Sequence, residues 1–247
     1  MKKIILSLCC FLLTACNDYQ IKDGKVYYKW FHGGALEYRT RLVENADAET
    51  FKSIPNKEGM EFAKDKNSVF LRGRLLKNAE PNSFEQLHEY YWKDKNNVYL
   101  FAFGEAVVED ADPNTFSVLK EYWAADKHHI FHQQYKMEGI NKATFVPIDE
   151  FWAKDDKYYY HKTTRLDLLD YASAEVVSKY YIKDKNGVYL KTGEKLPNAN
   201  PNTFVAFIHT NAGYDDQFMF SGAKNEGLIT EEYRKTYVGN KEIVIVK

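Results

Sequence analysis

Cysteine is scarce in this chain: there are three among 247 residues, and all lie within the first sixteen positions. Cys9 and Cys10 lie inside an apolar stretch near the N-terminus, and Cys16 follows that stretch closely. If the stretch is removed, a single cysteine remains and no internal disulfide is possible. We therefore expect the mature chain to be stabilised by packing alone.

Other absences bear on function. The sequence contains no Gly-x-Ser-x-Gly elbow, P-loop, dinucleotide fingerprint or His-Glu-x-x-His motif. Acidic and basic residues are nearly balanced, 35 against 34, so the basic excess that is typical of a nucleic-acid-binding surface is missing. The sequence thus predicts a protein that is not an enzyme, uses no cofactor and does not bind nucleic acid.

The N-terminus has the parts of a secretory signal. Lys2 and Lys3 supply a charged start, and an apolar stretch follows from Ile4 to Leu13. This stretch is too short to cross a hydrocarbon core of roughly 30 Å as a helix. It leads into Leu13-Thr14-Ala15-Cys16, which resembles the lipobox of bacterial lipoproteins, where the signal is cut before a cysteine that receives a diacylglycerol.

The lipobox resemblance implies a signal peptide over residues 1–15, lipid (including palmitate) on Cys16, and a tether over residues 16–22. Two or more acyl chains anchor a protein durably, whereas one chain binds marginally. An aspartate directly after the cysteine tends to retain Gram-negative lipoproteins in the inner membrane, but Asn17 stands there, so we expect the outer membrane of the cell envelope. The alternative is an ordinary signal peptide with an incidental Cys16.

A tandem repeat organises the rest of the chain. Aspartates that open a short polar turn recur at spacings of 29, 32, 29 and 29 residues: Asp65, Asp94, Asp126, Asp155 and Asp184. A weaker copy begins at Asp23, and a degenerate copy follows near Asp216. We expect about six units over residues 23–222, followed by a degenerate β segment over residues 223–247.

The repeated turns have the signature of β-hairpins. After each aspartate come turn residues and then an apolar pair, as in Lys95-Asn96-Asn97 before Val98-Tyr99. An aspartate at the start of a turn accepts a hydrogen bond from the backbone two residues on. Aromatic residues recur three positions before the aspartate (Phe62, Tyr91, Trp123, Trp152, Tyr181) and five positions after it (Phe70, Tyr99, Phe131, Tyr160, Tyr189). Aromatic residues favour strands, so the fold class is predicted to be all-β.

Both faces of each hairpin are predicted to be apolar. The two-residue period puts Trp92 and Tyr99 on one face and Tyr91 and Leu100 on the other, which favours stacked sheets. Segments such as Ala111-Asp112-Pro113-Asn114-Thr115-Phe116 predict one helical turn whose phenylalanine fills the core between neighbouring sheets. The expected architecture is a tandem repeat of roughly three-stranded β-meanders with short helical turns, in a propeller-like or solenoid-like array.

Two motifs alternate along the chain: hairpins of the form Lys-Asp-Lys-Asn-x-Val-Tyr and segments of the form Ala-Asp-Pro-x-Thr-Phe. This pattern resembles the DKNYY family, a group of bacterial envelope proteins that are commonly lipoproteins. The resemblance covers about residues 21–222. It departs from the pattern at Asp156-Lys157-Tyr158, which replaces the usual turn, and at Ala174, which replaces the phenylalanine. The resemblance implies export and the fold class, and it carries over no catalytic residue.

Two segments could be interpreted as metal sites. In a strand, His128 and His132 would project to one face, as an i, i+4 pair of ligands does. Their register instead favours a turn position for His128 and a strand position for His132. The segment Asp94-Lys95-Asn96 begins like a calcium loop, but Val98 occupies the position of the fifth residue, where an oxygen ligand is needed. No metal site is therefore predicted.

The function predicted from these features is a membrane-anchored envelope lipoprotein that binds a protein partner, for example as an immunity or anti-toxin protein. Contacts with the partner are expected where the repeat is interrupted, as in the insertion at residues 53–59. One alternative is a glycan-binding module in which Trp92, Trp123 and Trp152 form a stacking ladder. The other alternative is an unrecognised hydrolase.

Overall fold

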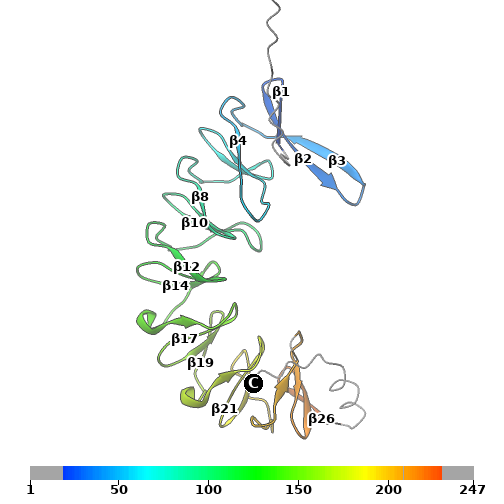
Figure 1. The fold of residues 1–247 in the computed structure, drawn as a ribbon, viewed down its shortest axis with the longest axis vertical. Helices are drawn as coiled ribbons and strands as arrows, with labels where there is room; N and C mark the ends of the chain where they lie inside the picture. Colours follow the sequence, from blue (N-terminus) through cyan, green and yellow to red (C-terminus); the bar gives the residue numbers. More distant parts are fainter. Residues whose placement is uncertain (1–18, 208, 230–247) are drawn as a thin grey trace, which may run out of the picture. The chain divides into compact units, whose positions relative to one another are not determined.

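A computed structural model describes residues 19–207 and 209–229, and in these ranges the chain is built from short antiparallel strands (Figure 1). The helical elements of the described chain are two 3-10 turns, η1 (Lys142–Thr144) and η2 (Tyr171–Ser173). The all-β prediction is confirmed. The chain divides into two compact units, residues 1–106 and 107–247. In the described ranges, no helix is long and apolar enough to cross a bilayer.

The first unit contains three sheets in chain order. The first sheet consists of β1 (Tyr19–Lys22), β2 (Lys25–His32) and β3 (Glu37–Leu42). The second sheet consists of β4 (Lys52–Ile54), β5 (Phe62–Lys64), β6 (Val69–Leu71) and β7 (Arg74–Leu75). The third sheet consists of β8 (Glu85–His88), β9 (Tyr91–Lys93), β10 (Val98–Leu100) and β11 (Ala106–Val107), which falls at the division between the units.

The second unit contains four sheets. The fourth sheet is formed by β12 (Ser117–Lys120), β13 (Trp123–Ala125), β14 (Ile130–His132) and β15 (Tyr135–Lys136), and the fifth by β16 (Val146–Pro147), β17 (Trp152–Lys154), β18 (Tyr159–His161) and β19 (Thr164–Leu166). The sixth sheet is formed by β20 (Glu175–Val176), β21 (Tyr181–Asp184) and β22 (Gly187–Leu190), and the seventh by β23 (Val205–Ala206), β24 (Ala212–Tyr214), β25 (Phe218–Ser221) and β26 (Lys224–Leu228).

The described chain contains seven sheets where the sequence predicts about six units, because the opening and closing copies each form a sheet of their own. Five of the sheets have four strands instead of the expected three. The additional strand follows each phenylalanine turn; in β8, for example, Glu85 and Gln86 pair with Lys93 and Trp92. The predicted tether over residues 16–22 overlaps β1, and the predicted C-terminal segment from residue 223 overlaps β26. The array therefore extends further at both ends than predicted.

Both faces of the interior sheets are buried, as the two-residue period predicts. The register pairs Tyr99 with Trp92 and Leu100 with Tyr91. In the second sheet, Ala63 and Phe70 pack toward the first sheet, and Phe62 and Val69 pack toward the third. In the second unit, separate apolar clusters join the fourth sheet to the fifth, the fifth to the sixth and the sixth to the seventh. Each unit is thus a stack of sheets in chain order.

The phenylalanine side chains fill the spaces between sheets, as predicted, but the segment predicted as a helical turn at residues 111–116 is an ordinary turn, and the helical turns of the described chain are η1 and η2. Phe84 is 4% exposed, and its ring centroid lies 5.5 Å from that of Phe62 in the preceding sheet and 5.1 Å from that of Trp92 in its own. Phe204 contacts Tyr181 and Phe220 in the same way. Each turn therefore packs a residue of the repeat against two sheets at once.

Candidate binding site

Buried aspartates begin the hairpin turn in six of the seven sheets, and each is 2–4% exposed: Asp65, Asp94, Asp126, Asp155, Asp184 and Asp215. One carboxylate oxygen accepts hydrogen bonds from the backbone N–H groups two and three residues further on. The other oxygen accepts one from the backbone N–H at the start of the preceding phenylalanine turn. The predicted turn role is confirmed, and the last member of the set is Asp215 where the sequence suggested Asp216.

The electrostatics of these carboxylates follow from their donors. Burial acts to raise the pKa of Asp126, but backbone N–H groups of Asp112, His128 and His129 outweigh it and hold that pKa below its ordinary value. At Asp94, donors include the Tyr99 hydroxyl, 2.8 Å from Oδ2. The oxygens of Asp94 thus accept hydrogen bonds from the protein itself, and these bonds account for an aspartate at this position without a calcium ion.

A second contact beside the aspartate varies from sheet to sheet, and both of its partners change together. Where a lysine follows the aspartate, the residue that begins the phenylalanine turn is acidic, and Lys127 Nζ lies 3.0 Å from Asp112 Oδ2. In the fifth and seventh sheets an aspartate replaces the lysine, and the turn begins with asparagine instead. Asn141 Nδ2 donates to Asp156 Oδ1 at 2.9 Å. The paired exchange avoids placing two carboxylates side by side.

The histidines do not converge. His132 is buried in β14, where Nε2 lies 3.0 Å from the Glu150 carbonyl oxygen, and His161 occupies the same position in β18 beside the Lys179 carbonyl. Burial lowers the pKa of each of these histidines to about 4. His128 is exposed in the turn, away from a strand. In the described part of the chain, no three histidine, cysteine, aspartate or glutamate side chains come together as a metal site requires.

The tryptophans that would form a glycan-stacking ladder lie in the core. Trp92, Trp123 and Trp152 are each 0% exposed. The indole N–H of Trp123 donates to the Asp149 carbonyl oxygen at 2.7 Å, and that of Trp152 to the Ser178 carbonyl at 2.8 Å. These rings are therefore not available to stack on a sugar, and the proposed ladder is wrong.

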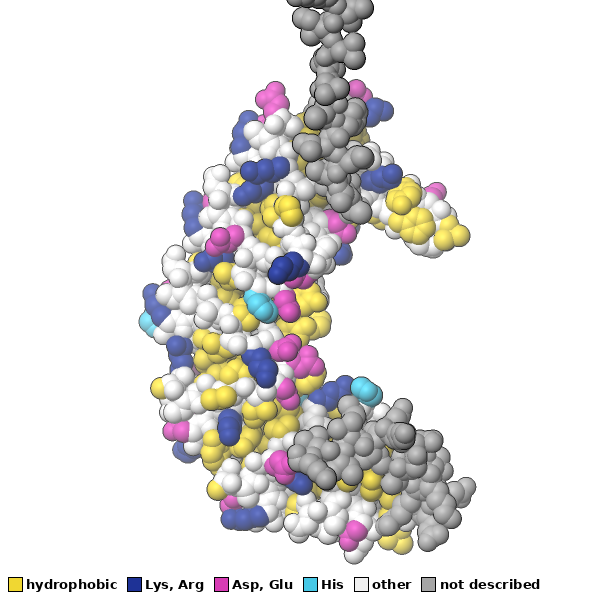
Figure 2. Space-filling model, in the orientation of Figure 1, with side chains coloured by type: hydrophobic (Ala, Val, Ile, Leu, Met, Phe, Trp, Pro, Cys, Tyr) yellow, Lys and Arg dark blue, Asp and Glu magenta, His cyan; other side chains and the backbone are white. Residues whose placement is uncertain are grey.

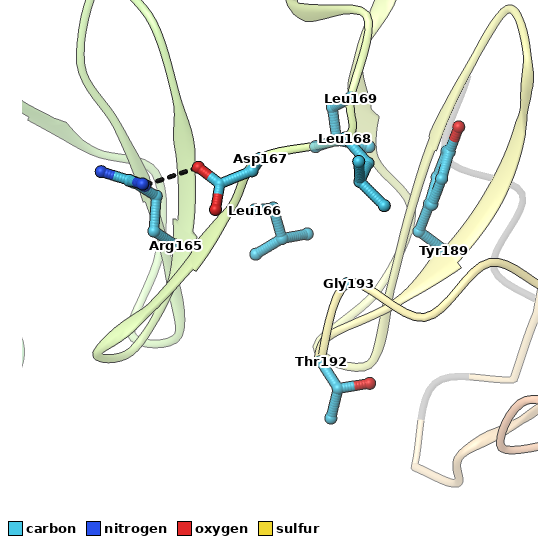
Figure 3. A pocket seen from close by; sticks show the side chains of 8 residues that line it. All are labelled: Arg165, Leu166, Asp167, Leu168, Leu169, Tyr189, Thr192 and Gly193. Carbon is cyan, nitrogen blue, oxygen red and sulfur yellow. Dashed lines mark hydrogen bonds and ion pairs between the residues drawn. The ribbon is translucent and has the colours of Figure 1, made fainter.

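A small pocket of about 170 Å³ lies between the fifth and sixth sheets (Figure 3). It is lined by Arg165, Leu166, Asp167, Leu168, Leu169, Tyr189, Thr192 and Gly193. Leu166 and Tyr189 are buried, whereas Leu168 is 75% exposed. Arg165 Nε pairs with Asp167 Oδ1 at 2.6 Å on the side away from Tyr189. The pocket thus combines an apolar interior, an exposed apolar side chain and a charged margin.

This pocket was not predicted from the sequence. Its visible signal is Leu168, which stands where the other repeats have Asn78, Asp110, Gly139 and Asn198. Leu166 and Leu169 lie at positions that are apolar in the other repeats too, and both pack in the core. Leu168 is exposed and also lines the pocket, which the repeat pattern does not indicate.

The insertion predicted as a binding loop is ordered by its own contacts. Asn56 Nδ2 donates to the carbonyl oxygens of Ile54 and Met60, and Asn56 Oδ1 accepts from the Met60 N–H at 2.9 Å. Met60 packs against the apolar cluster of the second and third sheets. Glu58 accepts a hydrogen bond from Gln86 of β8. Pro55, Lys57 and Gly59 remain exposed and form the part of the insertion that is open to a partner.

The predicted lipidation residue, Cys16, lies outside the described residues. So does the signal peptide predicted over residues 1–15. The described chain starts at Tyr19, the first residue of β1, which is three positions after Cys16.

Fold and sites together define a class: a repeat protein of small stacked antiparallel sheets, in which a buried aspartate links six of the seven hairpins by hydrogen bonds to the turn before them. The chain belongs to the DKNYY family, whose model matches residues 5–102 and 91–224. The two matches overlap at residues 91–102 and together span residues 5–224. No curated protein and no solved structure matches the chain.

Proposed function

We propose that this protein is a membrane-anchored envelope lipoprotein whose repeat array binds a protein partner and catalyses no reaction. The lipid would be on Cys16, within the Leu-Thr-Ala-Cys segment, and the outer membrane is the proposed location. An immunity or anti-toxin role is one form that such binding would take. Repeat arrays of stacked units commonly serve as binding surfaces for proteins.

The observation that carries the binding proposal is the pocket between the fifth and sixth sheets. At about 170 Å³ it is smaller than the roughly 300–1,000 Å³ of typical small-molecule sites. It is large enough to accept part of a side chain from a partner. Leu168, at its margin, would be buried by the same contact. Apolar anchors of this kind, surrounded by polar groups, carry much of the affinity in protein interfaces.

The buried aspartates and two buried histidines of the described chain have structural hydrogen-bond partners. The aspartates hold turns, and His132 and His161 meet backbone carbonyls. The aromatic residues of the hairpins form the core. This use of the chemically capable side chains favours binding over hydrolysis, and burial of the tryptophans favours a protein over a glycan.

The test is capture of a partner by the lipoprotein, identification of that partner by mass spectrometry and measurement of its affinity. Leu168→Asp should weaken the affinity by at least about tenfold, the effect of losing a central apolar anchor. Leu228→Asp is the matched control, because Leu228 is 73% exposed in the same unit but lies on β26. Equal loss from both substitutions would contradict the assignment, and binding to a glycan array without a protein partner would favour the glycan module.

The insertion at residues 53–59 is the second proposed contact region. Lys57→Glu reverses an exposed charge without touching the hydrogen bonds of Asn56. It should slow association with a partner that faces this loop, whereas Lys77→Glu, also exposed, should not. Unchanged association in both variants would remove the loop from the interface.

A further inference from the structure

The hairpin of β2 and β3 is longer than its sheet needs. β1 pairs with Lys25–Tyr28, the first half of β2. Beyond Tyr28, the strands continue as a two-stranded ribbon in which Lys29 pairs with Thr40 and His32 with Glu37. The central strands of the other sheets have three or four residues, against eight in β2. This ribbon therefore projects beyond β1, whose pairing with β2 stops at Tyr28.

The end of the ribbon, which we call the apolar tip, exposes three large side chains. Phe31 is 53% exposed, Leu36 80% and Tyr38 67%. The Phe31 and Tyr38 rings meet at 5.3 Å, so the two form one surface. Figure 2 shows hydrophobic side chains gathered at the end of this hairpin. Apolar side chains gathered at an exposed hairpin end suggest contact with an apolar phase or partner.

Basic and aromatic residues lie along the hairpin that carries the apolar tip, with Lys29 and Arg39 nearest to it. The hairpin from Lys25 to Leu42 contains four basic residues (Lys25, Lys29, Arg39, Arg41) and one acidic residue (Glu37). Lys29 Nζ lies 4.3 Å from the centre of the Tyr38 ring, and the Arg41 guanidinium lies 5.1 Å from that of Trp30. Tryptophan, tyrosine and basic side chains prefer the interface between lipid and water, and basic residues attract anionic headgroups.

The direction of the chain brings this tip to the proposed anchor. β1 starts at Tyr19, opposite Tyr28, and runs away from the apolar tip. Two residues lie between Cys16 and Tyr19, so the three steps from one to the other span at most about 10–11 Å at roughly 3.3–3.6 Å per residue. Tyr28 and Phe31 are also three residues apart in a strand, about 10 Å. A lipid on Cys16 would hold Tyr19 within about 10 Å of the bilayer, so the ribbon is long enough to reach it.

We propose that the apolar tip inserts into the interfacial region of the bilayer that holds the lipid anchor, with the basic residues of the hairpin against anionic headgroups. The inference rests on the proposed lipid at Cys16. Insertion would give the protein a second point of attachment, which would restrict the orientation of the first unit on the membrane more than a lipid alone does.

The test uses the complete lipoprotein in vesicles of phosphatidylethanolamine and phosphatidylglycerol, with bromine on the acyl chains as a fluorescence quencher. Phe31→Trp places the probe at the apolar tip. Leu168→Trp is the matched control, at an exposed apolar position in the other unit. The signal is compared with the wild type, whose own tryptophans include Trp30 in the same hairpin. Phe31→Trp should show a blue shift and strong quenching, and Leu168→Trp should show neither.

The outcomes separate the two proposals. If the wild-type lipoprotein fails to float with the vesicles, the anchor and the tip insertion are both overturned. If it floats but Phe31→Trp is quenched no more than Leu168→Trp, the anchor stands and the insertion is overturned. A blue shift that requires an added protein partner and occurs without lipid quenching would assign the tip to that partner and overturn the insertion too.

Discussion

Asp155 accepts four hydrogen bonds: from the backbone of Asn141, Lys157 and Tyr158 and from the Tyr160 hydroxyl. One residue therefore holds the turn that follows it, the helical turn before it and a core tyrosine. Four donors around one buried carboxylate make this position sensitive to change, because each donor left without a partner in the core costs about 1–3 kcal/mol.

Asp155→Ala should accordingly lower the free energy of unfolding by at least about 3 kcal/mol. Urea unfolding of the chain measures the loss. Lys157→Ala, at an exposed position of the same turn, is the control and should cost less than about 0.5 kcal/mol. A loss at Asp155 as small as that of the control would mean that water replaces the carboxylate without penalty.

The buried histidines predict a dependence of stability on pH. His132 and His161 have pKa values of about 4 in the folded chain against 6.5 as the ordinary value, so between these values the unfolded chain binds protons that the folded chain does not. Their stabilisation is complete above pH 6.5 and is lost as the pH falls toward 4. The loss is on the order of 2–3 kcal/mol for each histidine.

The double variant His132→Gln and His161→Gln should flatten the stability curve between pH 6.5 and 4 relative to the wild type. Urea unfolding at a series of pH values gives both curves, and the difference removes the contribution of the carboxylates. His128→Gln, at an exposed turn position, serves as the control and should keep the wild-type slope. Parallel curves for wild type and double variant would contradict the assignment.

At the scale of elements, the turns are what the sequence specifies best. Asp, Asn and Gly at fixed offsets determine the hairpins through local hydrogen bonds, and the aromatic positions follow from a two-residue period. Both can be read without knowing which sheets meet. The additional strand of the four-stranded sheets could not be predicted, because segments such as Glu85–His88 lack a strong alternating pattern and form a strand through pairing with β9. The pocket beside Leu168 depends on two sheets meeting, which no local pattern encodes.

The phenylalanine turn gives a direct test of the predicted core. Phe116 is 6% exposed, and its ring lies 5.5 Å from that of Phe131. Phe116→Ala should lower the free energy of unfolding by about 3–5 kcal/mol, because a buried phenylalanine is replaced by a cavity. Phe103→Ala is the matched control, since Phe103 is 71% exposed. Urea unfolding of both variants measures the difference, and a loss below about 1 kcal/mol for Phe116 would contradict its place in the core.

The hairpin turn between β6 and β7 depends on a glycine for two separate reasons. Gly73 has φ +69°, and a Cβ there would overlap Tyr28 of the first sheet. Gly59 has nearly the same φ, +65°, but has open space around it. Gly59→Ala should therefore cost about 1 kcal/mol for the backbone conformation, whereas Gly73→Ala should cost at least about 2 kcal/mol more. Thermal unfolding compares the two, and equal losses would show that Tyr28 moves aside easily.

At the scale of the whole molecule, each unit is held together by contacts between consecutive sheets, so its stability is expected to depend on nearest-neighbour interfaces. The sequence anticipates this organisation through the repeat spacing. It does not reveal where the two compact units divide, near residue 106, because the repeat continues through that point. Attachment to a membrane is a separate, proposed property, which would depend on a lipid at Cys16 and on the apolar tip of the first sheet.

Cys16→Ser tests that property, since the thioether lipid proposed at Cys16 needs a thiol. Metabolic labelling with a fatty acid should label the wild type and leave Cys16→Ser unlabelled, and cell fractionation should find the variant unprocessed or released from the membrane. Cys9→Ser is the control: it removes a thiol from the apolar stretch and keeps Cys16, so labelling should persist. Equal labelling of wild type and Cys16→Ser would exclude Cys16 as the lipid site, and the proposed insertion of the apolar tip would then lose the anchor on which it depends.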